Sequence, residues 1–397
     1  MKESRITSDW LLPSVLLLLT TSSPIATGDE AEVRKQLQRS TTQYTTAESW
    51  ATRRAALRED FLKGARLWPL PNRPIVRAIV HSRREHDGYS VENVALETLP
   101  GFYCTGNLYR PLGRKDLGPA ILCPHGHFRP LGRFRESHQV RCAHLARMGA
   151  TVFSYSMVGW HDSQQTTHDD PLVLALQTWN SIRVVDYLAS LEQVDADRVG
   201  ITGASGGGTQ TFFLSLVDDR VKATAPLVIV YPWAAPQGCL CEGGLPVMQV
   251  AKTNAIELAA ASSPRPQLII SVGNDPTEDF PQVGFPFIKH MYRVAGALDA
   301  VRNVHFADEG HDFGPSKRTL VYEFFAKHLH MEPSRSVASK TSLLAEDLTK
   351  ITIESPEQME AFNDKHPRPA HAISGIPAVA EVFDSHLRSL REQQATH

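Results

Sequence analysis

The sequence predicts an α/β protein with a mostly parallel central sheet and helices on both faces. From residue 119 onward, apolar runs such as "PAILCPHG" alternate with helical patterns. Strands that are apolar throughout are typical of parallel sheets covered on both faces. The length of 397 residues and the hydrophobic content of 42% suffice for one large core. A formal net charge of -2, with Lys and Arg spread along the chain, argues against nucleic acid as a partner.

Residues 1–28 have the layout of a secretory signal peptide. Basic residues precede an apolar run from Trp10 to Leu19, and small residues lead to Gly28. The run is shorter than the roughly 20 residues that span a bilayer, which disfavours an uncleaved anchor. We expect export to the periplasm or the medium, with cleavage near Gly28 and no membrane association afterwards.

Two elements of different character follow the leader. Residues 29–74 are rich in Ala, Arg, Glu, Leu and Gln and are expected to form a helical segment that packs on the core. From residue 75 to 109 the chain alternates apolar and polar residues, which predicts antiparallel strands.

The parallel part of the sheet is expected to come next, within a catalytic domain of residues 75–330. The expected strands lie in 119–126, 150–157, 199–202, 223–230, 267–273 and 302–307, and the expected helices in 137–149, 171–192, 206–216, 251–261, 285–297 and 317–329. Residues 331–397 are more polar and regain helical patterns only near 356–363 and 378–391, so we expect a C-terminal extension on the outside.

The stretch "GITGASGGGTQ" joins one of these strands to a helix. Residues 203–207 fit Gly-x-Ser-x-Gly, the nucleophile elbow of α/β-hydrolases, in which Ser205 sits on a strained turn that leaves no room for flanking side chains. A phosphate-binding loop is the alternative, but Thr209-Gln210 stand where that loop carries Lys-Ser. The context therefore predicts that Ser205 is a nucleophile.

A serine nucleophile needs a base and an orienting acid, in the chain order Ser, Asp or Glu, His. Asp275 directly follows the strand "QLIISVG", and His311 follows the strand "RNVHFA". Asp279, in the same loop as Asp275, is the second choice for the acid. His305 lies inside an apolar strand and is expected to be a packed histidine.

The oxyanion of a tetrahedral intermediate needs backbone donors. One expected donor is the N–H of Gly206, directly after the nucleophile. The other should come from the loop "PHGHF" after the strand "AILC", with the N–H of His127 as first choice and that of Phe128 as second.

Two short motifs resemble metal ligands. His125 and His127 form a His-x-His, and Cys239 and Cys241 form a Cys-x-Cys among five cysteines in all. Neither motif has a further ligand at the spacing of a zinc site. We therefore expect no metal and no cofactor.

Motifs along most of the chain after the leader resemble those of exported bacterial acetyl xylan esterase-like α/β-hydrolases, which are related more distantly to dienelactone hydrolases. They include "FLKGARLWPLPNRP", "CPHGHFRPLGRF", "LQTWNSIRVVDYL", "TGASGGGTQT", "CLCEGG" and "EGHDFGPSKR". The resemblance implies ester hydrolysis with Ser205 as nucleophile, Asp275 as acid and His311 as base. The loop 156–163 departs from the Asp-x-x-Gly-x-Gly-x-Ser of many such enzymes, so the shape beside the pocket is expected to differ.

The predicted function is a secreted serine carboxylic-ester hydrolase that removes acetyl or other acyl groups from carbohydrate. Aromatic side chains expected at the pocket, as a sugar platform or as core, are Phe128, Trp160, Trp233 and Tyr231. A peptidase of the prolyl-oligopeptidase type is an alternative, although too few residues precede residue 75 to form its propeller. A non-catalytic binding module on the same fold is a further alternative.

Overall fold

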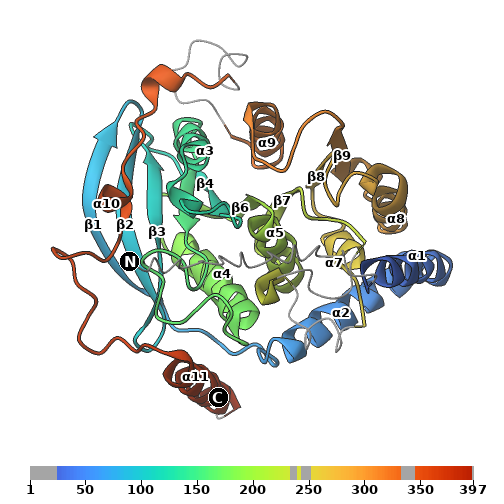
Figure 1. The fold of residues 1–397 in the computed structure, drawn as a ribbon, viewed down its shortest axis with the longest axis horizontal. Helices are drawn as coiled ribbons and strands as arrows, with labels where there is room; N and C mark the ends of the chain where they lie inside the picture. The colour runs from blue at the N-terminus through green and yellow to red at the C-terminus, as the bar shows by residue number, and fades with distance from the viewer. Residues whose placement is uncertain (1–24, 233–238, 243–251, 332–344, 396–397) are drawn as a thin grey trace, which may run out of the picture.

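The computed structural model describes residues 25–232, 239–242, 252–331 and 345–395. Most of the predicted leader and Trp233 lie outside these ranges. One nine-stranded sheet runs through the molecule in the order β1-β2-β3-β5-β4-β6-β7-β8-β9 (Figure 1). The fold is that of an α/β-hydrolase, as predicted.

The sheet is antiparallel at one edge and parallel elsewhere. Strands β1, β2, β3 and β5 pair antiparallel in that order, and β5, β4, β6, β7, β8 and β9 pair parallel. The strands are β1 (Arg77–His86), β2 (Tyr89–Leu99), β3 (Phe102–Pro111), β4 (Gly118–Pro124), β5 (Thr151–Tyr155), β6 (Val194–Ala204), β7 (Val221–Leu227), β8 (Gln267–Val272) and β9 (Val301–Phe306). The carboxyl ends of the parallel strands share one edge, where loops can bring distant residues together.

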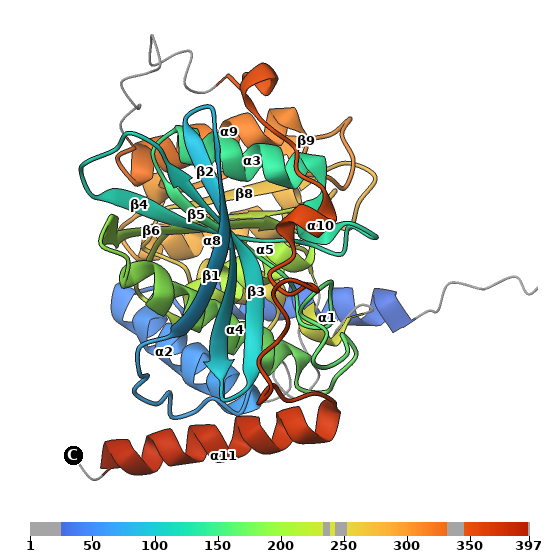
Figure 2. The ribbon, with the colours of Figure 1, turned by 90° about the vertical axis from the view of Figure 1, so that its left-hand side faces the viewer.

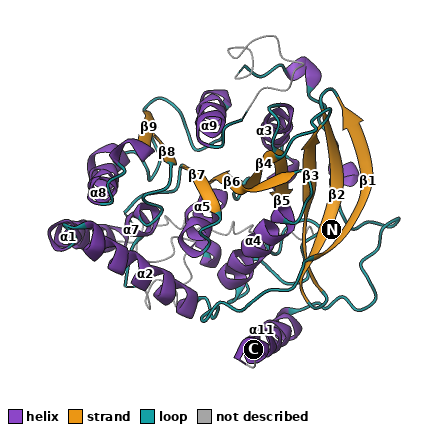
Figure 3. Ribbon diagram, turned by 180° about the vertical axis from the view of Figure 1, so that it is seen from behind, coloured by secondary structure: helices purple, strands orange, loops and turns teal. Residues whose placement is uncertain are grey.

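Helices cover both faces of the sheet (Figures 1 and 3). One face carries α3 (Glu136–Arg147) and α9 (Pro315–His328), whose buried side chains form a common core with β4, β7 and β8. The other face carries α4 (Val173–Ala189), α5 (Gly206–Val217), α7 (Ala255–Ala260) and α8 (Phe280–Val294). The apolar runs of the parallel strands are explained by this double cover.

The N-terminal helices α1 (Ile25–Gln43) and α2 (Ala47–Gly64) pack on the second face. Thr46 and Ser49 form a capping box that starts α2. Trp50 is fully buried and donates from Nε1 to Ser263 Oγ at 2.8 Å. Trp50 therefore joins this helical segment to the core by packing and by a hydrogen bond.

The C-terminal segment crosses the antiparallel edge and ends in α11 (Ile376–Ala395), which lies across the bottom of Figure 2. The 3-10 turn η4 (Leu348–Lys350) and the short α10 (Pro356–Met359) precede it. Asn93 Nδ2 donates to Gln358 O at 2.8 Å, and Asn107 Nδ2 donates to Met359 O at 2.8 Å. Phe383 and Leu387 of α11 are buried in the core. The extension thus covers strands that would otherwise expose polar interior groups.

Across the part of the chain that the structure describes, no helix has the length and apolar character needed to cross a membrane.

Candidate active site

The turn at Ser205 joins β6 to α5 in a strained conformation. Ser205 has φ 56° and ψ −129°, a region that residues with side chains rarely adopt. A Cβ on Gly203 would lie 2.4 Å from the carbonyl carbon of Gly207, and one on Gly207 would lie 2.4 Å from Pro124 O. The backbone approaches too closely for side chains at these positions, which is the physical reason for the glycines of the motif.

Asp275 and His311 meet at the carboxyl ends of β8 and β9. The two strands pair in register up to Val272 and Phe306, so the loops that follow them begin side by side. His311 Nδ1 lies 2.5 Å from Asp275 Oδ2. The Asp275 side chain is 2% exposed, whereas that of His311 is 41% exposed. The carboxylate is thus buried behind an imidazole that is open to a substrate.

The Asp275 carboxylate is held by further hydrogen bonds. Thr277 donates to Asp275 Oδ1 from its backbone N–H at 2.8 Å and from Oγ1 at 2.6 Å. Burial works to raise the pKa of Asp275, but the hydrogen bonds from His311 and Thr277 outweigh it, so this pKa lies below its ordinary value. An ionised Asp275 accepts the Nδ1 proton of His311 and leaves Nε2 free to act as a base.

The competing carboxylate, Asp279, points elsewhere. It precedes α8 and forms an ion pair with Arg34 of α1. His305 lies within β9, where its Nδ1 is 2.9 Å from Ser271 Oγ. The structure therefore brings Asp275, rather than Asp279, to His311.

The loop after β4 lies directly against the serine turn. A Cβ on Gly126 would be 2.9 Å from Ser205 Cβ, so only glycine permits this approach. His125 is buried, its Nδ1 lies 2.8 Å from Gly126 O, and its Nε2 accepts the Met157 N–H at 3.0 Å. Burial is the main reason that the pKa of His125 is well below its ordinary value. A neutral His125 therefore holds the loop in place.

The second-choice oxyanion donor is already engaged. The N–H of Phe128 donates to Gly126 O at 2.8 Å within the same loop. That leaves the N–H of His127 as the better candidate from this loop.

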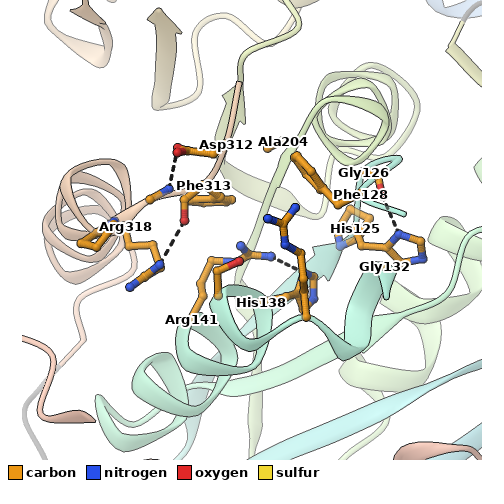
Figure 4. Close-up of a pocket in the computed structure, with 15 residues that line it drawn as sticks. His125, Gly126, Phe128, Gly132, His138, Arg141, Ala204, Asp312, Phe313 and Arg318 are labelled. Atoms are coloured by element: carbon orange, nitrogen blue, oxygen red, sulfur yellow. Dashed lines mark hydrogen bonds between the residues drawn. The ribbon is translucent and has the colours of Figure 1, made fainter. Parts of the chain in front are cut away.

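A cavity of about 180 Å³ opens beside the serine turn (Figure 4). It is bounded by Ala204, next to Ser205, and by Asp312, next to His311. Phe128 lies on one side and Phe313 on the other, with Arg141 and His138 between them. Residues that line it are Pro124, His125, Gly126, Phe128, Gly132, Arg135, Ser137, His138, Arg141, Ala204, Asp312, Phe313, Gly314, Pro315 and Arg318. The basic groups in this wall were not singled out from the sequence, because they come from helices distant in the chain.

The aromatic residues expected at the pocket differ in exposure. Phe128 lines the cavity, and its ring centroid is 6.0 Å from that of His311. Trp160 is only 5% exposed, with its ring edge-on to those of His125 and His127. Trp160 is therefore part of the interior beneath the loops and offers almost no surface on which a sugar could stack.

The loop 156–163, which departs from the usual pattern, has a structural acid. Asp162 Oδ1 accepts from Arg133 Nη2 at 2.9 Å and from Thr105 Oγ1 at 2.7 Å, and its Oδ2 accepts from the Ala361 N–H at 2.6 Å. Asp162 and Arg133 are both buried. Asp162 thus links the loop 156–163 to the sheet and to the C-terminal segment.

The side chain of His127 belongs to a group that the sequence analysis missed. Its Nε2 lies 2.9 Å from His168 Nε2 and 3.2 Å from Cys241 Sγ, and Cys239 completes the group. We call these four residues the His/Cys cluster. No further ligand was expected because the His-x-His and the Cys-x-Cys were each considered alone. The fold brings one histidine of the His-x-His and both cysteines of the Cys-x-Cys together with His168, and His125 is not among the four.

Comparisons with known proteins agree with this architecture. A sequence profile described as acetyl xylan esterase (AXE1) matches residues 177–235. Among curated proteins no match was found. The structure named methylesterase BT1017 is 36% identical, covers 92% of this chain and 81% of its own, and superposes with a TM-score of 0.80.

Two more distant structures share the fold. A proposed acetyl xylan esterase from Bacteroides fragilis (BF1801) is 15% identical over 75% of this chain and 86% of its own, with a TM-score of 0.55. A glucuronoyl esterase from Teredinibacter turnerae is 15% identical over 71% of this chain and 85% of its own, with a TM-score of 0.53. Because methylesterase BT1017 is 36% identical over 92% of this chain, the chain belongs to the family of that methylesterase. It is a carboxylic ester hydrolase with the α/β-hydrolase fold.

Proposed function

We propose that this protein is an exported serine esterase that hydrolyses a carbohydrate ester through an acyl-enzyme. The observation that carries the proposal is the pair of Asp275 and His311, placed by β8 and β9 at the edge of the sheet where β6 ends in the strained turn of Ser205. A paired Asp and His with a serine on an elbow is the arrangement that activates a hydroxyl for acyl transfer.

The chemistry uses this chain's own groups. His311 Nε2 takes the proton of Ser205 Oγ as the oxygen attacks the ester carbonyl, and Asp275 stabilises the imidazolium that forms. His311 then gives the proton to the leaving alcohol. Water attacks the acyl-enzyme in a second round with the same base, which releases the acid and frees Ser205.

Backbone groups stabilise the developing oxyanion. Gly206 is the first residue of α5, where N–H groups have no acceptor within the helix and the dipole favours negative charge. The N–H of His127 is the second donor in this proposal, because the loop that carries it lies against Ser205 through Gly126.

The cavity favours a sugar that carries an acidic group. Its lining includes Arg135, Arg141 and Arg318, of which Arg141 is buried and Arg318 is buried and paired with Glu346. Arg135 is exposed and lies over the Phe128 ring at 5.1 Å from its centroid. An exposed guanidinium beside the apolar rings of Phe128 and Phe313 suits a sugar that carries a carboxylate or its ester. One relative is named a methylesterase, so we place a methyl ester of a sugar carboxylate first and an acetyl ester second.

The test compares the two products on two polymers. The purified protein is incubated with methyl-esterified pectin and with acetylated xylan, and methanol and acetate are measured. We expect methanol release that Ser205→Ala abolishes. Acetate release alone would move the assignment to the acetyl ester, and cleavage of small peptides without ester hydrolysis would favour the peptidase alternative.

Export is tested separately. Expression of the full chain in a bacterial host, followed by fractionation and sequencing of the mature N-terminus, should give a periplasmic or secreted protein that begins near Asp29. An uncleaved protein in the cytoplasmic fraction would contradict the proposed export.

A further inference from the structure

Four ligand atoms of the His/Cys cluster converge on one point beside the serine turn. His168 Nε2 lies 2.9 Å from His127 Nε2 and 3.3 Å from Cys239 Sγ, and Cys241 Sγ lies 3.2 Å from His127 Nε2. The two sulfur atoms are 2.7 Å apart. All four atoms lie within 4.8 Å of one another, so one ion could contact all of them.

Both imidazoles are fixed with Nε2 directed at that point. The opposite nitrogen of His127, Nδ1, lies 3.3 Å from Glu242 Oε1, and Nδ1 of His168 lies 2.6 Å from Val158 O. A histidine that binds a metal through one nitrogen usually donates from the other to a carboxylate or a backbone carbonyl. Each histidine here has such an acceptor in place.

We propose that the His/Cys cluster is a zinc site with His127, His168, Cys239 and Cys241 as its ligands. Two thiolates and two imidazoles around one ion are a donor set that zinc prefers, in a tetrahedron with bonds of about 2.0 to 2.3 Å. Such bonds place two sulfur ligands about 3.8 Å apart. The ion would therefore open the present sulfur pair by about 1 Å.

The site is structural rather than catalytic. Four protein ligands complete the tetrahedron and leave no position for a reactive water. The ligands come from three separate places: the loop after β4, the loop between β5 and α4, and the segment of the 3-10 turn η2 (Leu240–Glu242). A Cβ on Gly206 would lie 2.7 Å from His127 Cε1, so the first of these loops also contacts the start of α5. The ion thus fastens loops around the serine turn.

The test measures metal in the full-length protein. Protein prepared without added metal is titrated with Zn²⁺ against a chromophoric chelator, and metal content is measured by mass spectrometry. We expect about one zinc per chain. Cobalt substituted for zinc should show the sulfur-to-metal charge-transfer band and tetrahedral visible bands that two thiolates produce.

Matched variants assign the ligands. Cys239→Ser with Cys241→Ser, and separately His168→Gln, should lose at least about tenfold in zinc affinity. The control Cys123→Ala removes a buried thiol outside the cluster and should keep one zinc. Circular dichroism establishes that each variant is folded. Bound zinc should also protect Cys239 and Cys241 from alkylation until a chelator is added.

Several results would overturn the site. They are a wild-type protein that binds no zinc, zinc retained by the folded double variant, or a disulfide between Cys239 and Cys241 seen as a mass lower by two hydrogens. None of them affects the proposed esterase mechanism, because the Ser205 chemistry does not pass through the ion.

Discussion

Two groups of polar side chains flank the start of α5, and they are held in different ways. Asp275 and His311 follow adjacent, hydrogen-bonded strands, and Thr277 fixes the carboxylate from two positions away. The side chains of the His/Cys cluster come from loops, and the contacts of its two histidines span 41 to 114 positions in the chain. The sheet positions the first group, whereas loops bring the second together and, in our proposal, a zinc ion holds it.

Among changes at the first group and its serine, Ser205→Ala should reduce turnover most. The substitution removes one oxygen, and we expect turnover to fall by about 10⁴ to 10⁶. Activity is measured on an ester substrate, with circular dichroism as the control for folding. A folded variant with near-normal turnover would exclude Ser205 as the nucleophile.

The second test separates the two carboxylates of one loop. Asp275→Asn keeps the shape but loses the charge that orients His311, and we expect turnover to fall by about 10⁴. Asp279→Asn removes an ion pair to Arg34 that is partly exposed, so activity should remain and stability should change by about 1 kcal/mol or less. The reverse order of effects would transfer the role of the acid to Asp279.

The difference between the two groups also explains what the sequence could predict. Ser205, Asp275 and His311 stand at strand ends, where local pattern and the rules of parallel sheets fix their neighbourhood. The alternation of apolar strands and helices similarly predicted the order of elements, and α8 begins earlier than expected because Pro281 fits a first helical turn.

Contacts between loops were not predictable in this way. His127 and Cys241 are 114 positions apart, and no local spacing relates them to His168. Trp160 was placed at the pocket because its loop should border it, but loop position alone does not determine which way a ring points. The joint presence of a His-x-His and a Cys-x-Cys in one chain was the available signal, and only the fold shows which half of the His-x-His is used.

The third test concerns the strained turn that both groups adjoin. Gly207→Ala would place a Cβ 2.4 Å from Pro124 O, a backbone atom that cannot move aside, so we expect a loss of about 3 kcal/mol in unfolding free energy. Gly310→Ala is the control, since its Cβ would meet no atom within 4 Å, and its effect should be about 0.5 kcal/mol or less. Thermal and urea unfolding give both values. Equal stability of the two variants would contradict the steric account of the motif.

The fourth test asks whether the two groups act separately. A serine-directed phosphonate should label Ser205 in the protein both before and after treatment with a chelator, because the base and the acid come from the sheet. Turnover that vanishes on chelation together with loss of labelling would show that the nucleophile requires the His/Cys cluster and that the two groups do not act separately.

The smallest expected effect lies in the loop that carries His311. Lys317 has a fully buried side chain, and its Nζ lies 2.7 Å from Glu309 Oε2 and 2.6 Å from Asp312 Oδ1. Burial works to raise the pKa of each carboxyl, but Lys317, together with Ser316 Oγ at Glu309 and the Gly314 N–H at Asp312, outweighs it, so both pKa values lie below their ordinary range. Lys317→Met keeps the packing and removes the charge, and because both carboxylates reach solvent we expect a loss of about 1 kcal/mol in unfolding free energy at neutral pH.

The pH dependence of the unfolding free energy distinguishes ion pairing from packing at Lys317. Carboxyls with a depressed pKa in the folded state contribute stability above their ordinary pKa of about 4, and that contribution is lost as the pH falls through the depressed values. The difference in unfolding free energy between wild type and Lys317→Met should therefore be largest near neutral pH and shrink below about pH 4. Lys289→Met, at an exposed position of α8, is the control and should show no such trend. A difference that stays constant into acid would mean that Lys317 stabilises the His311 loop through packing alone, and the ion pairs would then have no part in holding the base in place.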